Sequence, residues 1–311
     1  KVGVDVTLDQ LRSEYDAVFV SVGAHNSTTM GVPGEDLKGV LPAVEFLRDA
    51  ALGRPVKVGQ SVAVVGGGNA AIDAARTALR LGAKEVHIVY RRLRSDMPAD
   101  PAEIEAAIEE GIQVHYLTAP TRLIGADGKI AQMECVRMRL GDFDKSGRRR
   151  PVPVDASRTI VDVDTVIPAI GQSVDTSFAG KPADGEEALL MTKSGLVITD
   201  PDTMQTNVPG VFAGGDCVTG PATVIGAIGA GRQVAVEIDK FVGGSAWQHA
   251  DADVERVLVG TPIEEQCKRC VMPEMPVGER ARNFKEVELG LTEDMAVAEA
   301  ARCFQCDVRE Q

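Results

Sequence analysis

The sequence lacks long apolar runs, an excess of basic residues and the residue patterns of hydrolytic enzymes. No apolar stretch approaches the roughly eighteen residues that cross a membrane, and no signal peptide precedes the first expected strand. The 33 Lys and Arg residues face 46 Asp and Glu residues, which gives a net charge of −13. This balance argues against a nucleic-acid partner and against an anionic membrane surface. No Ser/His/Asp pattern or pair of carboxylates indicates hydrolysis, and nothing indicates the handling of glutamine.

The composition is that of a globular protein. Hydrophobic residues make up 44% and charged residues 25% of the 311 positions, which is enough chain for two or three domains with a sizeable core. Four of the six cysteines form two C-x-x-C pairs. Such pairs indicate metal or redox chemistry in a reducing compartment rather than a secreted disulfide framework. We therefore expect a cytoplasmic protein without membrane insertion.

The rest of the chain is organised around residues 61–92, which predict a strand, a glycine turn, a helix and a second strand. Residues 61–65 form a short run rich in β-branched side chains, typical of a buried parallel strand. Small residues then follow the G-x-G-x-x-G/A pattern of a dinucleotide-binding turn, in which a helix N-terminus binds the pyrophosphate. The expected pyrophosphate-binding residues are Gly66, Gly67, Gly68, Asn69, Ala70 and Ala71.

The second strand, expected over residues 85–90, ends in a way that favours NADPH over NADH. An NAD site would place a carboxylate here to accept a hydrogen bond from the ribose 2′-hydroxyl. This chain has Arg91 and Arg92 instead, and a guanidinium binds a 2′-phosphate through two hydrogen bonds. The alternative is a solvated basic pair that follows a strand.

The flanking segments predict further strands and helices. Helices are expected over residues 43–51, 101–110 and 293 onward, and a hairpin over residues 121–140 with Asp127 and Gly128 in its turn. Residues 161–168 predict a buried strand, whereas the basic run at residues 148–150 is interpreted as a solvated turn.

A second glycine-rich stretch, residues 211–223, leads into a helix expected to end near residue 242. Asp216 comes after a short strand, and the helix N-terminus after Pro221 offers free N–H groups and a positive dipole end. Such an end suits the electron-rich edge of a reduced flavin, and Asp216 is placed to bind a ribityl hydroxyl. An ordinary helix-capping turn explains the same residues.

The two C-x-x-C pairs lie near the end of the sequence, at Cys267 and Cys270 and at Cys303 and Cys306. Four thiolates hold either zinc or a four-iron cluster. A pair of unligated or redox-active dithiols is the third interpretation. The isolated Cys135 and Cys217 are interpreted as buried small hydrophobic residues.

With these residues identified, the chain resembles the NADPH-dependent glutamate synthase small-chain (beta subunit) family. It also resembles the related FAD/NAD(P)-dependent oxidoreductase subunits of the pyridine nucleotide–disulfide oxidoreductase superfamily. The resemblance covers nearly the whole chain. It is most specific in VVGGGNAAIDAARTALRLGA, VYRRLRSDMPAD, TMQTNVPGVFAGGDCVTGPATVIGAIGAGR and NFKEVELGLTEDMAVAEAARCFQC.

The resemblance implies an α/β fold of two Rossmann-like three-layer domains, one inserted in the other. It places an FAD-binding domain at residues 1–52 and 172–244, an NADPH-binding domain at 53–171 and a small helical module that contains cysteines at 245–311. The family's opening strand and its FAD-binding glycine turn do not precede residue 23, so the chain is expected to be truncated at its N-terminus. The first βαβ half of the FAD domain would then be missing.

The resemblance also implies further site residues. Ala169, Ile170 and Gly171 would lie where the NADPH domain meets the flavin domain, and Gly23 and Ala24 would form the equivalent junction on the flavin side. FAD would contact Gly215 and Asp216, with Thr223, Val224 and Ile225 at the isoalloxazine edge. Cys267, Cys270, Cys303 and Cys306 would hold a [4Fe-4S] cluster, with zinc as the alternative.

The function that follows is hydride transfer between NADPH and FAD, with electrons passing to iron–sulfur centres or to a partner subunit. No catalytic acid or base is expected, because the protein's part is to position the two cofactors. The alternatives are a non-catalytic nucleotide-binding assembly subunit and a disulfide reductase that uses the C-terminal C-x-x-C pairs. Oligomerisation and the electron acceptor stay open.

Overall fold

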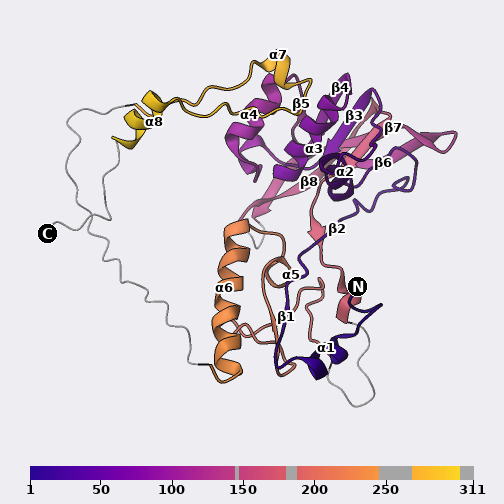
Figure 1. The fold of residues 1–311 in the computed structure, drawn as a ribbon. Helices are drawn as coiled ribbons and strands as arrows, with labels where there is room; N and C mark the ends of the chain where they lie inside the picture. The colour runs from indigo at the N-terminus through magenta and orange to yellow at the C-terminus, as the bar shows by residue number, and fades with distance from the viewer. Residues whose placement is uncertain (144–146, 180–187, 245–267, 302–311) are drawn as a thin grey trace. The chain divides into compact units, whose positions relative to one another are not determined.

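A computed structural model describes residues 1–143, 147–179, 188–244 and 268–301 of the chain (Figure 1). The chain divides into two compact units, Lys1–Ala246 and Trp247–Gln311. The first unit contains parallel sheets with helices packed against them, which confirms the predicted α/β class. The residue boundaries of the nested nucleotide-binding domains stay a prediction.

The main sheet of the first unit has four parallel strands. They are β3 (Ser61–Val65), β4 (Glu85–Val89), β5 (Gln113–His115) and β9 (Thr165–Pro168). Their order in space is β5-β4-β3-β9, so β3 is central and β9 pairs with it although about a hundred residues separate them. Because the strands are parallel, their carboxyl ends lie at the same edge of the sheet, where ligands bind in open α/β folds.

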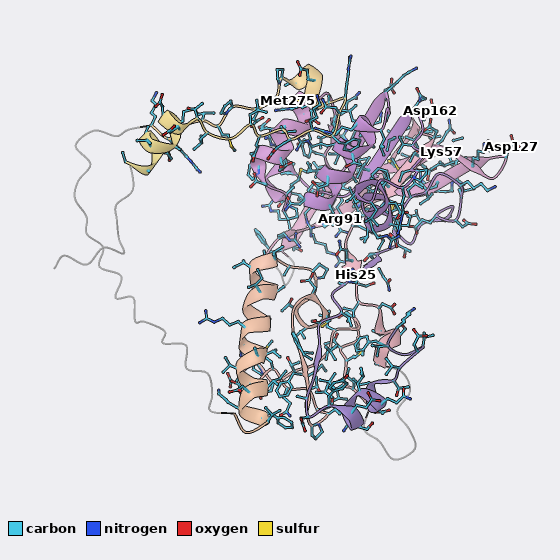
Figure 2. The ribbon with its side chains drawn as sticks, in the orientation of Figure 1. His25, Lys57, Arg91, Asp127, Asp162 and Met275 are labelled. Atoms are coloured by element: carbon cyan, nitrogen blue, oxygen red, sulfur yellow. The ribbon has the colours of Figure 1, made fainter. Side chains whose placement is uncertain are left out.

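Both faces of this sheet are covered, as its apolar strands require. Val62 and Val64 of β3 pack with the helices on one face, whereas Ala63 and Val65 pack with side chains of an antiparallel sheet on the other. This alternation is the two-residue period of a strand. The antiparallel sheet consists of β6 (Thr118–Ala126), β7 (Lys129–Phe143) and β8 (Arg149–Asp162). Asp127, predicted as a turn residue, lies between β6 and β7 (Figure 2).

Three helices cover the opposite face: α2 (Ala43–Ala51), α3 (Asn69–Arg80) and α4 (Pro101–Glu109). The side of α3 that faces the sheet is built from small residues, because alanine lets helix and strand pack closely. Its fully buried alanines are Ala71, Ala74, Ala75 and Ala78. The starts of α2 and α3 and the whole of β3 lie where the sequence predicted them.

A second, smaller parallel sheet pairs segments from the two ends of the first unit: β1 (Val18–Val20) lies beside β11 (Val211–Ala213). The remaining elements of this unit are α1 (Leu8–Glu14), β2 (Asn26–Ser27), η1 (Arg94–Asp96), β10 (Gln172–Ser173), η2 (Thr176–Ala179), α5 (Asp216–Thr219) and α6 (Val224–Phe241). The antiparallel pair β2–β10 joins the chain before α2 to the chain after β9.

The second unit contains two short helices among its described residues, α7 (Val277–Arg280) and α8 (Glu293–Ala300). Helix α8 begins at Glu293 as the sequence predicted, and the hydroxyl of Thr292 caps it by accepting a hydrogen bond from the backbone N–H of Met295 at 3.3 Å. Within the described part of the chain, no helix combines the length and the apolar character that a membrane crossing requires.

Two predicted boundaries are wrong. The strand expected over residues 161–168 is interrupted, because β8 ends at Asp162 and β9 begins at Thr165. Between them, the carboxylate of Asp164 accepts a hydrogen bond from the backbone N–H of Gln60 at 2.7 Å and thereby redirects the chain into the parallel sheet. The basic run is not wholly a turn either, since β8 already begins at Arg149.

A buried ion pair network fixes α3 against α4. Glu110 follows α4 with a fully buried side chain, and its carboxylate lies 2.8 Å from Nη2 of Arg76 and 2.9 Å from Nη1 of Arg80. Burial by itself raises the pKa of Glu110, but the hydrogen bonds and charges of Arg80 and Arg76 outweigh it, so the pKa lies below its ordinary value. The network thus holds the helix that begins at the glycine turn.

Replacing Glu110 by glutamine should lower the free energy of unfolding by about 3–5 kcal/mol, because it leaves two largely buried guanidinium groups without their carboxylate. Chemical denaturation measures this change. Glu109→Gln, on an exposed neighbour, is the matched control and should cost less than about 1 kcal/mol. Because the folded state lowers the pKa of Glu110 from 4.5, its stabilisation is lost as the pH falls, and Glu110→Gln should flatten that loss. Equal destabilisation by both variants would contradict the role of the network.

Candidate functional site

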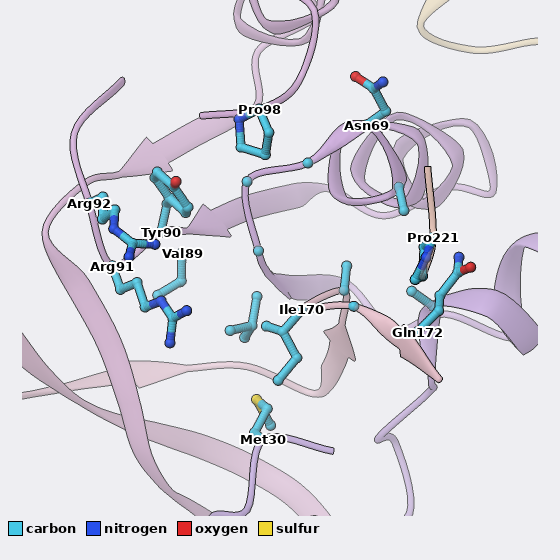
Figure 3. Close-up of a pocket in the computed structure, with 18 of the residues that line it drawn as sticks. Met30, Asn69, Val89, Tyr90, Arg91, Arg92, Pro98, Ile170, Gln172 and Pro221 are labelled. Atoms are coloured by element: carbon cyan, nitrogen blue, oxygen red, sulfur yellow. The ribbon is translucent and has the colours of Figure 1, made fainter. Parts of the chain in front are cut away.

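A cavity of about 620 Å³ lies at the carboxyl edge of the main sheet, over the turn between β3 and α3. Figure 3 shows Arg91 and Arg92 on one side of this turn, and Gln172 and Pro221 on the other. The residues predicted from the sequence that line the cavity are Gly66, Gly67, Gly68, Asn69, Ala70, Arg91, Arg92, Ala169, Ile170, Gly171 and Asp216. The fold therefore brings the glycine turn, the arginine pair and the predicted domain junction to one place.

Each glycine of the turn meets a different surrounding. Gly66 has a φ of +151°, and a Cβ there would lie 2.2 Å from the carbonyl oxygen of Ala169. A Cβ on Gly67 would lie 2.5 Å from the ring of Tyr90. At Gly68 the nearest atom would be Cγ of Pro98, at 3.8 Å, so a methyl group there would project into the cavity. Gly66 and Gly67 are thus required by packing, whereas Gly68 keeps the cavity open.

Helix α3 begins beside the cavity without a side-chain cap, because its N-cap residue is Gly68. Helices α1, α4, α6 and α8 are capped by the side chains of Thr7, Asp100, Thr223 and Thr292. The first amides of α3 and its positive dipole end are therefore available to an anion. The side chain of Asn69 is held aside, since its Oδ1 accepts a hydrogen bond from the backbone N–H of Asp100 at 2.9 Å.

The residues that follow β4 take different positions. Arg91 is exposed and lines the cavity, whereas Arg92 is 5% exposed and its Nε–H donates to the carbonyl oxygen of Arg149 at 2.9 Å. Tyr90 is buried beneath them, and its hydroxyl donates to the carbonyl oxygen of Asp96 at 2.6 Å. The arginine pair thus contains one side chain at the cavity surface and one that ties β4 to β8.

Sequence reasoning missed Arg148. This residue was assigned to a solvated turn, but it lines the cavity together with Arg91 and Arg92. The signal was the basic run itself, which stands at the return of a hairpin. The other lining residues that the sequence did not indicate are Met30, Val32, Ala43, Val44, Val65, Val89, Tyr90, Pro98, Thr118, Ala119, Pro120, Gln172 and Ala222. Pro221, which precedes the predicted flavin-side helix N-terminus, lines the cavity as well.

At the end of the cavity away from the arginines lie residues of the segment predicted to contact a flavin. Asp216 lines the cavity, and its Oδ1 accepts a hydrogen bond from the backbone N–H of Ala222 at 3.2 Å. Gly215 is the N-cap of α5 with a φ of +74°. Val224 and Ile225, at the start of α6, are 80% and 74% exposed. The segment thus contains an acidic group at the cavity and exposed apolar side chains at the start of α6.

The cavity does not include every predicted residue. Ala71 is buried in the interface between α3 and the sheet, and Ala24 is buried in the core around β1 and β11. Gly23 adjoins the ring of His25, and Thr223 caps α6. The remaining predicted residues that do not line the cavity are Gly215, Val224 and Ile225.

Three of the four predicted metal ligands, Cys267, Cys303 and Cys306, lie outside the described residues. The fourth, Cys270, donates its backbone N–H to a carboxylate oxygen of Glu299 at 2.8 Å. The residues that the structure describes contain no cluster of three or more metal-ligating side chains. Cys135 and Cys217 are buried, as predicted, and burial raises the pKa of the Cys135 thiol to about 11.

The packing at the turn predicts that one of two matched glycine substitutions destabilises the fold and that the other leaves its stability nearly unchanged. Gly66→Ala should lower the free energy of unfolding by about 1–3 kcal/mol, because the new Cβ meets a backbone oxygen in strained geometry. Gly68→Ala should leave it within about 0.5 kcal/mol, since its Cβ meets open space at an ordinary backbone angle. Thermal and chemical denaturation of the two variants measure the difference. Equal stability of the two would show that the turn is not closely packed.

Comparison with known proteins identifies the family. The model of the pyridine nucleotide-disulphide oxidoreductase family matches residues 2–231. The NADP(+)-dependent formate dehydrogenase subunit beta of Moorella thermoacetica is 46% identical over an alignment of 323 positions, which covers 98% of this chain and 44% of that protein. The glutamate synthase [NADPH] small chain of Azospirillum brasilense is 34% identical over an alignment of 256 positions, which covers 78% of this chain and 52% of that protein. The chain thus spans about half the length of these two relatives.

A solved structure with a similar fold is that of Mycobacterium tuberculosis FprA in complex with NADPH. The TM-score is 0.60 at 22% sequence identity, and the match covers 78% of this chain and 67% of FprA. The likeness supports the Rossmann-like fold that the sequence predicted. The match over residues 2–231, the formate dehydrogenase relative and the glutamate synthase relative together show that this chain belongs to the pyridine nucleotide-disulphide oxidoreductase family.

Proposed function

We propose that this chain positions NADPH against FAD for hydride transfer and passes the electrons to iron–sulfur centres or to a partner subunit. The observation that carries this proposal is the cavity, which joins the glycine turn and the arginines at one end to Asp216 and Pro221 at the other. A dinucleotide is an elongated ligand with phosphates between two ring systems. A cavity with guanidinium groups at one end and a flavin-side segment at the other suits that shape.

The residues around the glycine turn fit the phosphates of NADPH. The amides of Gly67, Gly68 and the start of α3 would bind the pyrophosphate, because no side-chain cap competes for them. The absence of a Cβ at Gly68 leaves room for this group to approach the backbone. Arg91, at the cavity surface, would bind the 2′-phosphate.

The residues at the other end of the cavity fit a flavin edge. Asp216 would accept a hydrogen bond from a ribityl hydroxyl, and the amides at the start of α6 would face the pyrimidine edge of the ring. The exposed Val224 and Ile225 would contact the ring itself. When bound, FAD supplies the ring that exchanges a hydride with NADPH. The chain's own task is to hold the nicotinamide beside that ring and to exclude water with Ile170 and Met30.

The proposed route for electrons beyond the flavin draws on the relatives. The Moorella thermoacetica protein is named a subunit, which supports a partner that accepts electrons. We retain Cys267, Cys270, Cys303 and Cys306 as proposed ligands of a [4Fe-4S] cluster, with zinc as the alternative. Iron, zinc and acid-labile sulfide analysis of anaerobically purified protein separates the two. Within the described residues no cysteine lines the cavity, so nothing there favours a disulfide reductase.

Anaerobic stopped-flow mixing with NADPH tests the proposal directly. With FAD bound, the flavin absorbance should bleach on addition of NADPH, and NADH should bleach it more slowly at equal concentration. Gly68→Ala should keep the fold but slow bleaching at low NADPH, because its methyl group occupies the space of the pyrophosphate. Binding of NADPH without any bleaching, with FAD saturating, would instead favour a non-catalytic assembly subunit.

Coenzyme preference gives a second test. Arg91→Ala should raise the dissociation constant of NADPH about ten- to a hundred-fold, because a charged hydrogen bond contributes about 1.5–3 kcal/mol. The dissociation constant of NADH should change less than about two-fold, since NADH has no 2′-phosphate. Arg94→Ala is the matched control: Arg94 is exposed, pairs with Glu105 and does not line the cavity. An unchanged NADPH/NADH ratio in Arg91→Ala would refute the assignment.

A further inference from the structure

The hairpin formed by β7 and β8 brings a third guanidinium group to the cavity. Phe143, the last residue of β7, pairs with Arg149, the first residue of β8, and the guanidinium of Arg149 lies 5.6 Å from the centre of the Phe143 ring. Arg148 directly precedes this closed pair and lines the cavity. Its position is therefore set by the hairpin, far in sequence from the glycine turn and from Arg91.

The hairpin is tied to the end of β4 by a buried hydrogen bond. The Nε–H of Arg92 donates to the carbonyl oxygen of Arg149 at 2.9 Å, across a separation of 57 residues. Arg92 is 5% exposed, so this charged donor lies in a low-dielectric setting where its hydrogen bond is strong. A carbonyl held in this way fixes the backbone next to Arg148.

The hydroxyl of Tyr90 is influenced by the charges of both Arg92 and Arg148. Burial raises the pKa of the Tyr90 hydroxyl, and the positive charges of Arg92 and Arg148 both oppose that rise. Tyr90, Arg92 and Arg148 all line the cavity, and the ring of Tyr90 packs against Gly67 of the turn.

We propose that Arg148 is a specificity-determining residue that binds the 2′-phosphate of NADPH together with Arg91, and that Arg92 is a positioning residue that holds the hairpin in place. This inference rests on the proposed NADPH function. Arg91 and Arg148 reach the phosphate from two separate elements, so the phosphate bridges the end of β4 and the hairpin. Of the two arginines after β4, Arg91 thus binds the phosphate and Arg92 positions the hairpin.

Isothermal titration of the full chain with NADPH and with NADH tests Arg148. Arg148→Ala should raise the NADPH dissociation constant about ten-fold and change that of NADH less than two-fold. Arg150→Ala is the matched control, because Arg150 lies two residues from Arg148 and carries the same charge. Its side chain is exposed and does not line the cavity. Equal losses in Arg148→Ala and Arg150→Ala would overturn the proposal, since they would reflect only the general field of the basic run.

Two further outcomes separate the alternatives. If Arg148→Ala weakened NADPH and NADH equally, Arg148 would bind the pyrophosphate and the proposal would fail. If the unaltered chain bound NADPH no more tightly than NADH, the proposed NADPH function would fail first. If it preferred NADPH and Arg148→Ala kept that preference, only the role of Arg148 would fall.

The positioning role of Arg92 has its own readout. In an Arg92→Gln background, Arg148→Ala should cost NADPH affinity less than about three-fold, because the hairpin is no longer held at the phosphate. Arg92→Gln alone should lower NADPH affinity and leave NADH affinity unchanged. A purely structural role would weaken both coenzymes together, and additive effects of the two substitutions would also refute the positioning role.

Discussion

The backbone of β3 approaches the end of β9 so closely at Gly66 that no side chain fits between them. A Cβ at Gly66 would lie 2.2 Å from the carbonyl oxygen of Ala169, and the N–H of Ala169 donates to the carbonyl of Val65 at 2.8 Å. This contact brings Ile170 and Gly171 beside the glycine turn. The parallel sheet holds β3 and β9 rigidly, so this contact fixes where the other groups around the cavity lie.

Electrostatics at the site are local rather than global. The chain carries a net charge of −13, yet three arginines line the cavity. Charges separated by more than a Debye length, about 8 Å at physiological salt, are largely screened. The acidic surface elsewhere therefore does little to oppose an anionic ligand at these arginines. The proposed selection of a phosphorylated dinucleotide would depend on where the guanidinium groups lie, and not on the sum of charges.

The buried network of Glu110 with Arg76 and Arg80 also helps to fix the helix that begins at the glycine turn. It joins α3 to the end of α4, and α3 begins at the glycine turn. The carboxylate is fully buried and compensated by two guanidinium groups, so loss of one partner leaves an uncompensated charge. Helix α3 is thus held in place by its packing against the sheet and by its ion pairs with Glu110.

The sequence by itself determined the βαβ unit, the glycine turn and the arginines after β4. These features depend on neighbours within about thirty residues, where strand and helix periodicity and backbone sterics act directly. The resemblance of residues such as those around Gly66 and Asp216 also identified the family. That resemblance also implied the α/β class, which the structure confirms. The boundaries of the nested domains stay a prediction.

Only the tertiary structure decided that Arg148 lines the cavity and that Arg92 is buried beneath Arg149. Arg92 donates to the carbonyl oxygen of Arg149, 57 positions away in the sequence, and no local pattern encodes such a contact. The interruption between β8 and β9 likewise follows from Asp164, whose carboxylate binds the backbone before β3. Long-range contacts assign different roles to chemically identical side chains, because burial and distance, rather than residue type, determine what each guanidinium can bind.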